Sequence, residues 1–295
     1  MKSVALVTCN MDPSLDEDMP LLCEAFDQLG ISAAMPSWDD PAIDWAGFDA
    51  ALLRSTWDYM DRLDQFLAWA DRCAAETRLF NPPALVRRNL DKHYLAGLEA
   101  AGIPIVPTRF AQPGDDPTAR LEEFLAGLEG SEFVVKPAIG AGSRDASRFG
   151  VEDHADALTH LRSMLDAGRS VLLQPYLARV DEEGETALVH IDGAFSHAIR
   201  KGPLLKRHAP GVAGLFAPET ISARQPGGDE LEVAAAACAH LAHLAPLYLR
   251  VDLIRNPAGQ PVVLELEMTE PSLFLAFGAG SADRLARALL SRCRA

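Results

Sequence analysis

The residues best suited to chemistry in this sequence are three acids near its C-terminus, Asp252, Glu265 and Glu267. They belong to a predicted β-hairpin, in which two runs rich in Val, Leu and Ile flank a turn at 256–259. Side chains alternate along a strand, so Glu265 and Glu267 share a face, and Asp252 falls within about one residue of Glu265 on the neighbouring strand. Three carboxylates with no Lys or Arg between them would favour a divalent cation such as Mg²⁺. The alternative is an amphipathic hairpin whose acids face water.

A magnesium site of this kind requires a phosphate-binding segment elsewhere in the chain. Residues 133–137 predict an apolar strand that carries Lys136 and leads into a loop with Gly140, Gly142 and Ser143. Glycines let backbone N–H groups approach phosphate oxygens, and lysine supplies charge. The spacing differs from the P-loop pattern and from a G-x-G-x-x-G that opens a helix. We therefore expect phosphate binding of another type.

Other cations have two interpretations each. Lys92 lies in the first turn of a helix predicted from Asn89 to Gly102, where the helix dipole gives a cation no advantage, so its partner is an anion or solvent. Arg200 and Lys201 end a predicted strand before a loop rich in Gly and Pro. These two residues form either a phosphate clamp or an exposed basic segment.

The strand predicted at 171–177 ends in Gln174-Pro-Tyr176-Leu177. Such a strand end can present alternating backbone N–H and C=O groups to the edge of a nucleobase. It can equally be a core strand that leaves the sheet.

Arg54, Ser55 and Thr56 follow the third predicted strand of the N-terminal region. Ligands gather at the carboxyl ends of strands in parallel α/β sheets, so Arg54 is expected to pair with a substrate carboxylate and the hydroxyls to assist. The alternative is a helix cap at Ser55 or Asp58, with Trp57 and Tyr59 packed in the core.

Strands and helices alternate over residues 1–85, which predicts a small parallel α/β layer. Beyond it, Asp192-Gly193 between two alternating runs predicts a second hairpin. We expect three domains, at 1–107, 108–180 and 181–295.

Composition restricts the function. The net charge of −15 argues against nucleic-acid binding, which rests on Lys and Arg. Five scattered cysteines without a C-x-x-C pair suit a reducing cytoplasm, and no apolar run approaches membrane-spanning length. The oligomeric state is left open between a monomer and a homodimer.

In this order, the segments resemble the ATP-grasp superfamily of carboxylate–amine ligases over nearly the whole chain. The resemblance implies a small N-terminal α/β domain and two α+β lobes whose antiparallel sheets enclose ATP. It also implies that Lys92, Lys136 and the loop Gly140–Ser143 bind the nucleotide phosphates. The remaining implied roles are adenine binding by Gln174, Tyr176 and Leu177, ribose binding near Glu185, phosphoryl stabilisation by Arg200, and Mg²⁺ (or Mn²⁺) binding by Asp252 and Glu265. Glu267 occupies a position where the superfamily often has Asn, so it is either a further ligand or an added charge.

A narrower resemblance is to the subgroup with Arg-Ser-Thr-Trp-Asp-Tyr early and Leu-Glu-Leu-Glu-x-x-Glu-Pro-Ser late, the cyclo-ligases of D-cycloserine biosynthesis. It implies that ATP activates the carboxylate of O-ureido-serine as an acyl phosphate, which a nitrogen of the same molecule attacks. Glu270 and Ser272 would then hold an ammonium group and a polar tail of this small, amino-acid-like substrate. The alternatives are a ligase that joins two amino acids and a non-catalytic nucleotide-binding protein of the same fold.

Overall fold

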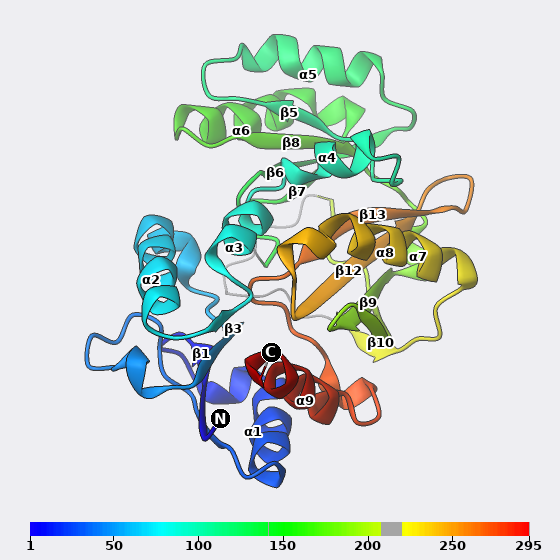
Figure 1. The fold of residues 1–295 in the computed structure, drawn as a ribbon. Coiled ribbons are helices and arrows are strands. Elements are labelled where there is room, and N and C mark those ends of the chain that lie inside the picture. Colours follow the sequence, from blue (N-terminus) through cyan, green and yellow to red (C-terminus); the bar gives the residue numbers. More distant parts are fainter. Residues whose placement is uncertain (141, 208–219, 295) are drawn as a thin grey trace.

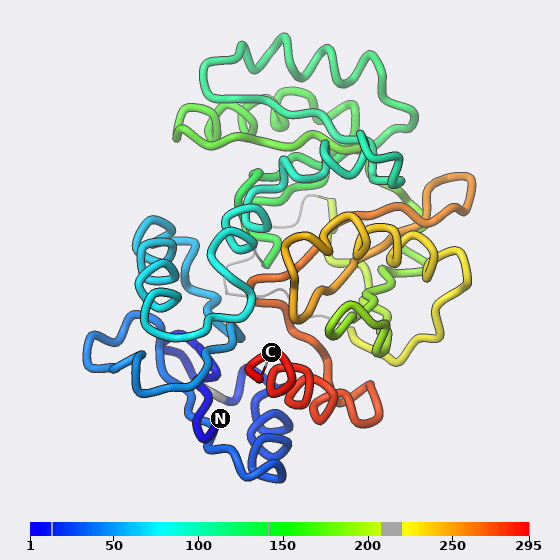
Figure 2. The backbone as a smooth tube through the Cα atoms, in the orientation of Figure 1, coloured from blue at the N-terminus to red at the C-terminus, as the bar shows by residue number. Residues whose placement is uncertain are grey.

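The computed structural model describes residues 1–140, 142–207 and 220–294, and the strands of these residues form three sheets (Figure 1). One sheet is parallel and two are antiparallel, which confirms the predicted mixture of α/β and α+β structure. The trace in Figure 2 shows the chain leaving the N-terminal sheet, crossing to the small lobe at the top of the view, and returning to the C-terminal sheet.

The N-terminal sheet has the parallel order β2-β1-β3-β4. Alternation along β1 sends Val4 and Leu6 to the face covered by α1, and Ala5 and Val7 to the face covered by α2. Its elements are β1 (Ser3–Thr8), α1 (Asp18–Gln28), β2 (Ser32–Ala34), β3 (Ala50–Ser55), α2 (Leu63–Glu76) and β4 (Leu79–Phe80).

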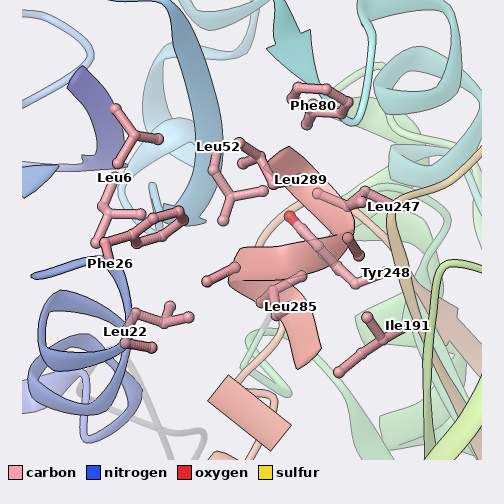
Figure 3. Close-up of a cluster of buried hydrophobic side chains, with 14 of the residues drawn as sticks. Leu6, Leu22, Phe26, Leu52, Phe80, Ile191, Leu247, Tyr248, Leu285 and Leu289 are labelled. Carbon is pink, nitrogen blue, oxygen red and sulfur yellow. The ribbon is translucent and has the colours of Figure 1, made fainter. Parts of the chain in front are cut away.

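One apolar cluster joins this sheet to the end of the chain (Figure 3). Leu22 and Phe26 of α1 share it with Leu285 and Leu289 of the last helix, α9 (Ser281–Arg294). Tyr248 belongs to the same cluster, and its hydroxyl lies 2.8 Å from the carbonyl oxygens of both Leu53 and Thr269, to either of which it can donate. The N-terminal sheet is therefore covered on one face by residues from both ends of the chain.

Two short helices, α3 (Pro83–Leu90) and α4 (Tyr94–Ala100), connect to the small lobe. The single helix expected from Asn89 to Gly102 is wrong, because the chain breaks at Asp91 and Lys92 to pair with the strand end at 138–139. Lys92 thus lies between two helices.

The small lobe is an antiparallel sheet in the order β5-β8-β6-β7, packed against α5 and α6 through buried Phe, Leu and Met side chains. Its elements are β5 (Arg109–Ala111), α5 (Pro117–Ala126), β6 (Glu132–Pro137), β7 (Ser147–Gly150), α6 (His154–Asp166) and β8 (Val171–Pro175).

The C-terminal sheet is antiparallel, in the order β11-β10-β9-β12-β13, with α8 against it. Both predicted hairpins are present: Asp192 and Gly193 turn with φ of 52° and 78°, and Asp252 pairs with Glu265 across β12 and β13. The elements are α7 (Val180–Glu183), β9 (Glu185–Ile191), β10 (Ala194–Lys201), β11 (Ile221–Ala223), α8 (Gly228–Leu241), β12 (Tyr248–Arg255) and β13 (Pro261–Glu267). Short 3-10 helices occur at Pro13–Leu15, Trp45–Gly47, Tyr59–Arg62, Val151–Asp153, Ala242–Leu244 and Leu275–Phe277.

Candidate active site

A cavity of about 220 Å³ lies where the three sheets approach one another. Most of the residues singled out in the sequence line it, although they come from distant parts of the chain. These are Lys92, Lys136, Gly140, Gly142, Ser143, Gln174, Tyr176, Leu177, Glu185, Lys201, Asp252, Glu265, Glu267, Glu270 and Ser272.

Asp252 is the buried centre of the charged group in this cavity, with 1% of its surface exposed. Its carboxylate accepts from Lys201 Nζ at 2.9 Å and from two nitrogens of Arg250, each at 2.8 Å. Burial alone would raise its pKa, but the charges of Arg250 and Lys201 hold the pKa well below its ordinary value. Lys201 also lies 3.0 Å from Glu185.

The expectation that no cation lies among the three acids is therefore wrong. Lys92 Nζ lies 2.9 Å from Glu265, and Arg250 pairs with Glu267. Despite burial, Lys92 and Lys136 keep the pKa of Glu265 below its ordinary value. Burial, with the charges of the two neighbouring acids, raises the pKa of Glu267 to about 8. The acids and bases therefore form one partly buried network, in which each acid has at least one cationic partner.

Lys92 connects this network to the glycine loop, because its Nζ also donates to the carbonyl of Gly140 at 2.6 Å. Gly142 and Ser143 both have left-handed φ, 60° and 58°. Ala141, inside the predicted loop Gly140–Ser143, lies outside the described residues. Burial lowers the pKa of Lys136 to about 8, so this lysine would gain from an anionic partner.

On the same side of the cavity, Gln174 is buried and donates to Thr108 Oγ1 at 2.9 Å. The guanidinium of Arg148 lies 3.5 Å from the centre of the Tyr176 ring. Gln174, Tyr176 and Leu177 make a partly apolar wall beside the lysines and the glycine loop.

Four of the candidates lie outside the cavity wall in the described part of the chain: Arg54, Ser55, Thr56 and Arg200. Arg54 is fully buried and donates to Asp18 at 3.2 Å and to the Pro271 carbonyl at 3.1 Å, so its expected contact with a substrate carboxylate is not what the structure shows. Arg200 turns away from the acids and donates to the carbonyls of Glu182 and Glu183. Side chains alternate along β10, so the next residue, Lys201, points to the opposite face from Arg200. Lys201 therefore lies beside the acids, where Arg200 was expected.

Several residues of the wall were not identified from the sequence, and three of them bear on the chemistry of the site: Arg250, Trp57 and Tyr59. Arg250 lies two positions before Asp252 on one strand face, and that spacing could have identified it. Trp57 and Tyr59 had been considered as core, and both are buried, but they also line the cavity and hold Glu270. Trp57 Nε1 donates to the Glu270 carbonyl at 2.8 Å, and Tyr59 hydrogen-bonds to its carboxylate.

Magnesium and a nucleotide fit these residues in one arrangement. Among the described residues, no three His, Cys, Asp or Glu side chains are grouped as a metal site. Mg²⁺ needs fewer protein ligands when it binds with substrate phosphates, because one or two carboxylates then suffice. The Asp252–Glu265 pair supplies two carboxylates in register, next to two lysines and the glycine loop.

Comparisons with known proteins identify the family of the chain. The family model described as "D-cycloserine synthetase DcsG, N-terminal domain" matches residues 4–81. The chain is 43% identical to "Cycloserine biosynthesis protein DcsG" of Streptomyces lavendulae, over 100% of both chains. It belongs to the DcsG family.

Solved structures support the DcsG assignment. The structure titled "Crystal structure of D-cycloserine synthetase DcsG" matches with a TM-score of 0.92 and 42% identity, over 99% of each chain. The ATP-grasp ligase PsnB, solved with a minimal precursor, Mg and ADP, shares the fold at a TM-score of 0.64 and 19% identity, over 98% of this chain and 97% of that one. Membership in the DcsG family, together with the fold of ATP-grasp ligases, makes the protein an ATP-dependent ligase that forms C–N bonds. No helix in the described residues is long and apolar enough to cross a membrane.

Proposed function

We propose that the protein closes O-ureido-serine to D-cycloserine, with release of ADP and phosphate. The proposal rests on one observation: the paired acids Asp252 and Glu265, the lysines Lys92 and Lys201, and Arg250 meet in a single cavity. Such a group can bind the phosphates of a nucleotide and the carboxylate to be activated. The similarity to DcsG over the whole chain supports the choice of substrate.

At the nucleotide end, Lys136, Gly140, Gly142 and Ser143 would bind the ATP phosphates, with Lys92 beside them. Gln174, Tyr176 and Leu177 would hold the adenine, and Glu185 would lie near the ribose. Catalysis of phosphoryl transfer is mostly positioning and charge stabilisation, which buried cations provide.

Asp252 and Glu265 would hold Mg²⁺ together with the phosphates, and Glu267 would join them if it released Arg250. Mn²⁺ presents similar chemistry to oxygen ligands. The bound metal would neutralise charge on the oxygens of the transferring phosphoryl group.

At the other end, Arg250 and Lys201 both pair with Asp252 and would orient the substrate carboxylate. Glu270 and Ser272 would face the ammonium group and polar tail of the substrate. An intramolecular attack needs one substrate pocket, and tethering of the nitrogen supplies much of the entropy otherwise lost in bringing reactants together.

All five cysteines are free thiols, which is consistent with the proposed cytoplasmic location.

The experiment is product mass spectrometry with ATP, Mg²⁺ and O-ureido-serine as the sole acceptor. Ring closure should give D-cycloserine, ADP and phosphate, with the carbamoyl group lost as carbon dioxide and ammonia. Glu265→Gln, which removes one proposed metal ligand, is the inactive control. If ADP appears only after a second amine is added, cyclisation is excluded and the two-substrate ligase takes its place.

A further inference from the structure

The carboxylate of Asp18, in the first turn of α1, is buried at 3% exposure and lies outside the cavity wall in the described part of the chain. It accepts hydrogen bonds from the backbone N–H groups of Leu273 at 2.6 Å, Phe274 at 3.1 Å and Leu275 at 2.6 Å. It also accepts from Arg54 at 3.2 Å. A buried charge is costly unless it is paired and hydrogen-bonded, so this concentration of donors satisfies Asp18 and fixes the backbone that donates.

The segment fixed in this way, residues 271–275, has two faces. Ser272 and Phe274 line the cavity, whereas Leu273 and Leu275 are buried in the cluster shared with the N-terminal sheet. Phe274 has a left-handed φ of 52°, which an L-residue other than glycine adopts only when its surroundings hold it there. The hydrogen bonds to Asp18 are the local restraint on this conformation.

Arg250 is coupled to the same segment. Its Nη1 donates to the carbonyl of Ser272 at 2.8 Å, and its guanidinium lies 5.6 Å from the centre of the Phe274 ring. The position of the guanidinium that faces Asp252 therefore depends on the backbone that Asp18 holds.

Residues 54–59 hold the preceding part of the chain. Arg54 donates to the Pro271 carbonyl at 3.1 Å, Trp57 donates to the Glu270 carbonyl at 2.8 Å, and Tyr59 hydrogen-bonds to the Glu270 side chain. Asp18 and Arg54, themselves paired, thus bind consecutive parts of one wall of the cavity.

We infer that Asp18 and Arg54 are positioning residues for the substrate: they determine its affinity without touching it, by holding residues 271–275 and, through them, Arg250. This inference rests on the proposed function only in assigning the substrate to that end of the cavity. The nucleotide end is built by the small lobe, with Lys136 and Gln174, and the Asp18 side chain has no hydrogen bond to either residue in the described part of the chain. Loss of the positioning should therefore change the KM for substrate and leave the KM for ATP unchanged.

The test is Asp18→Asn, which preserves side-chain size but removes the charge and turns one acceptor into a donor that faces N–H groups. We expect amide hydrogen exchange in residues 272–276 to accelerate and the KM for O-ureido-serine to rise roughly tenfold, as for loss of a charge-assisted hydrogen bond. The KM for ATP should stay within the error of the wild-type value. Arg54→Lys keeps a positive charge beside Asp18 but has a shorter reach to Pro271. If Asp18→Asn does not fold, the same measurements are made on Arg54→Lys.

The matched control is Glu230→Gln. Glu230 is a carboxylate at 2% exposure near the start of α8 that accepts from a backbone N–H and pairs with Arg224, but it has no contact with residues 271–275 among those described. It should lose stability without faster exchange in 272–276 and without a change in KM.

Equal effects of the two substitutions, a parallel rise in the KM for ATP, or unchanged exchange in Asp18→Asn would each overturn the inference. Absence of turnover of O-ureido-serine by the wild-type protein would contradict the proposed function instead. The exchange comparison would still decide whether Asp18 holds the segment.

Discussion

Replacing Glu270 by Gln should stabilise the folded protein at pH 8 and change its stability little at pH 5. Burial raises the pKa of Glu270 from its ordinary value of 4.5 to about 7, although Tyr59, Lys92 and Arg250 act in the opposite direction. The folded protein therefore retains a proton that the unfolded chain has released. The stability contributed by this proton is present below pH 4.5 and is lost as the pH rises through 7.

The size of the effect follows from the change in pKa. A shift from 4.5 to about 7 corresponds to about 3 kcal/mol for a fully desolvated group. Glu270 lines an open cavity and is only partly buried, so solvent screening reduces the expected gain of Glu270→Gln to about 1–2 kcal/mol at pH 8.

The assay is urea unfolding of wild type and variant at pH 5 and pH 8, with a chelator and without nucleotide, so that bound metal does not alter the charge. Glu267, whose pKa is raised to about 8, titrates in the same range, but it is present in both proteins and cancels in the difference. Glu122→Gln, at an exposed position of α5, is the control and should show no pH-dependent difference. The quantity to compare is the free energy of unfolding of Glu270→Gln minus that of wild type. A smaller difference at pH 8 than at pH 5 would refute the reasoning.

Three further predictions concern the charged network. Lys136→Ala should weaken ATP binding by about 2–3 kcal/mol in calorimetry. The affinity of the wild-type protein for ATP should fall as the pH rises through about 8, where Lys136 loses its charge. Unchanged affinity in the variant would refute the role of Lys136. Glu265→Gln should remain folded by circular dichroism, although somewhat less stable because Lys92 loses its ion pair. Its ADP release at saturating Mg²⁺ should disappear, and near-normal release would mean that the metal site is misplaced. Arg250→Lys keeps the charge but loses the paired bonds to Asp252, so kcat should fall about 100-fold in an ADP-release assay, and a normal kcat would exclude Arg250 from the reaction.

Local patterns in the sequence predicted the acidic hairpin and its register well. Counting back from the turn through Leu253 and Val263 brings Asp252 within one residue of Glu265, and a β-bulge between Asp252 and Leu253 supplies the last step of the register. The glycine loop after Lys136 was equally visible, since its glycines and lysine are contiguous.

The contacts between the acids and bases could not be predicted in the same way. Lys201 reaches Asp252 only because β9 lies between β10 and β12, an order of strands that no local pattern specifies. Arg54 follows the rule that ligands gather at strand ends, yet α1 and residues 271–275 cover it in the folded chain. That cover depends on segments more than 200 residues apart.

The packing of α9 against α1 has a consequence for synthesis of the protein. The strands of the first sheet can all pair once residue 80 has been made. One of its apolar faces is then covered by α1 alone, and the cluster on that face is completed only when residues 281–294 leave the ribosome. The proposed boundaries at 107 and 180 would then separate sheets without separating folding units. A chain truncated before Ser281 would expose Leu22 and Phe26 to water, which makes the final helix a condition for the stability of the first strands.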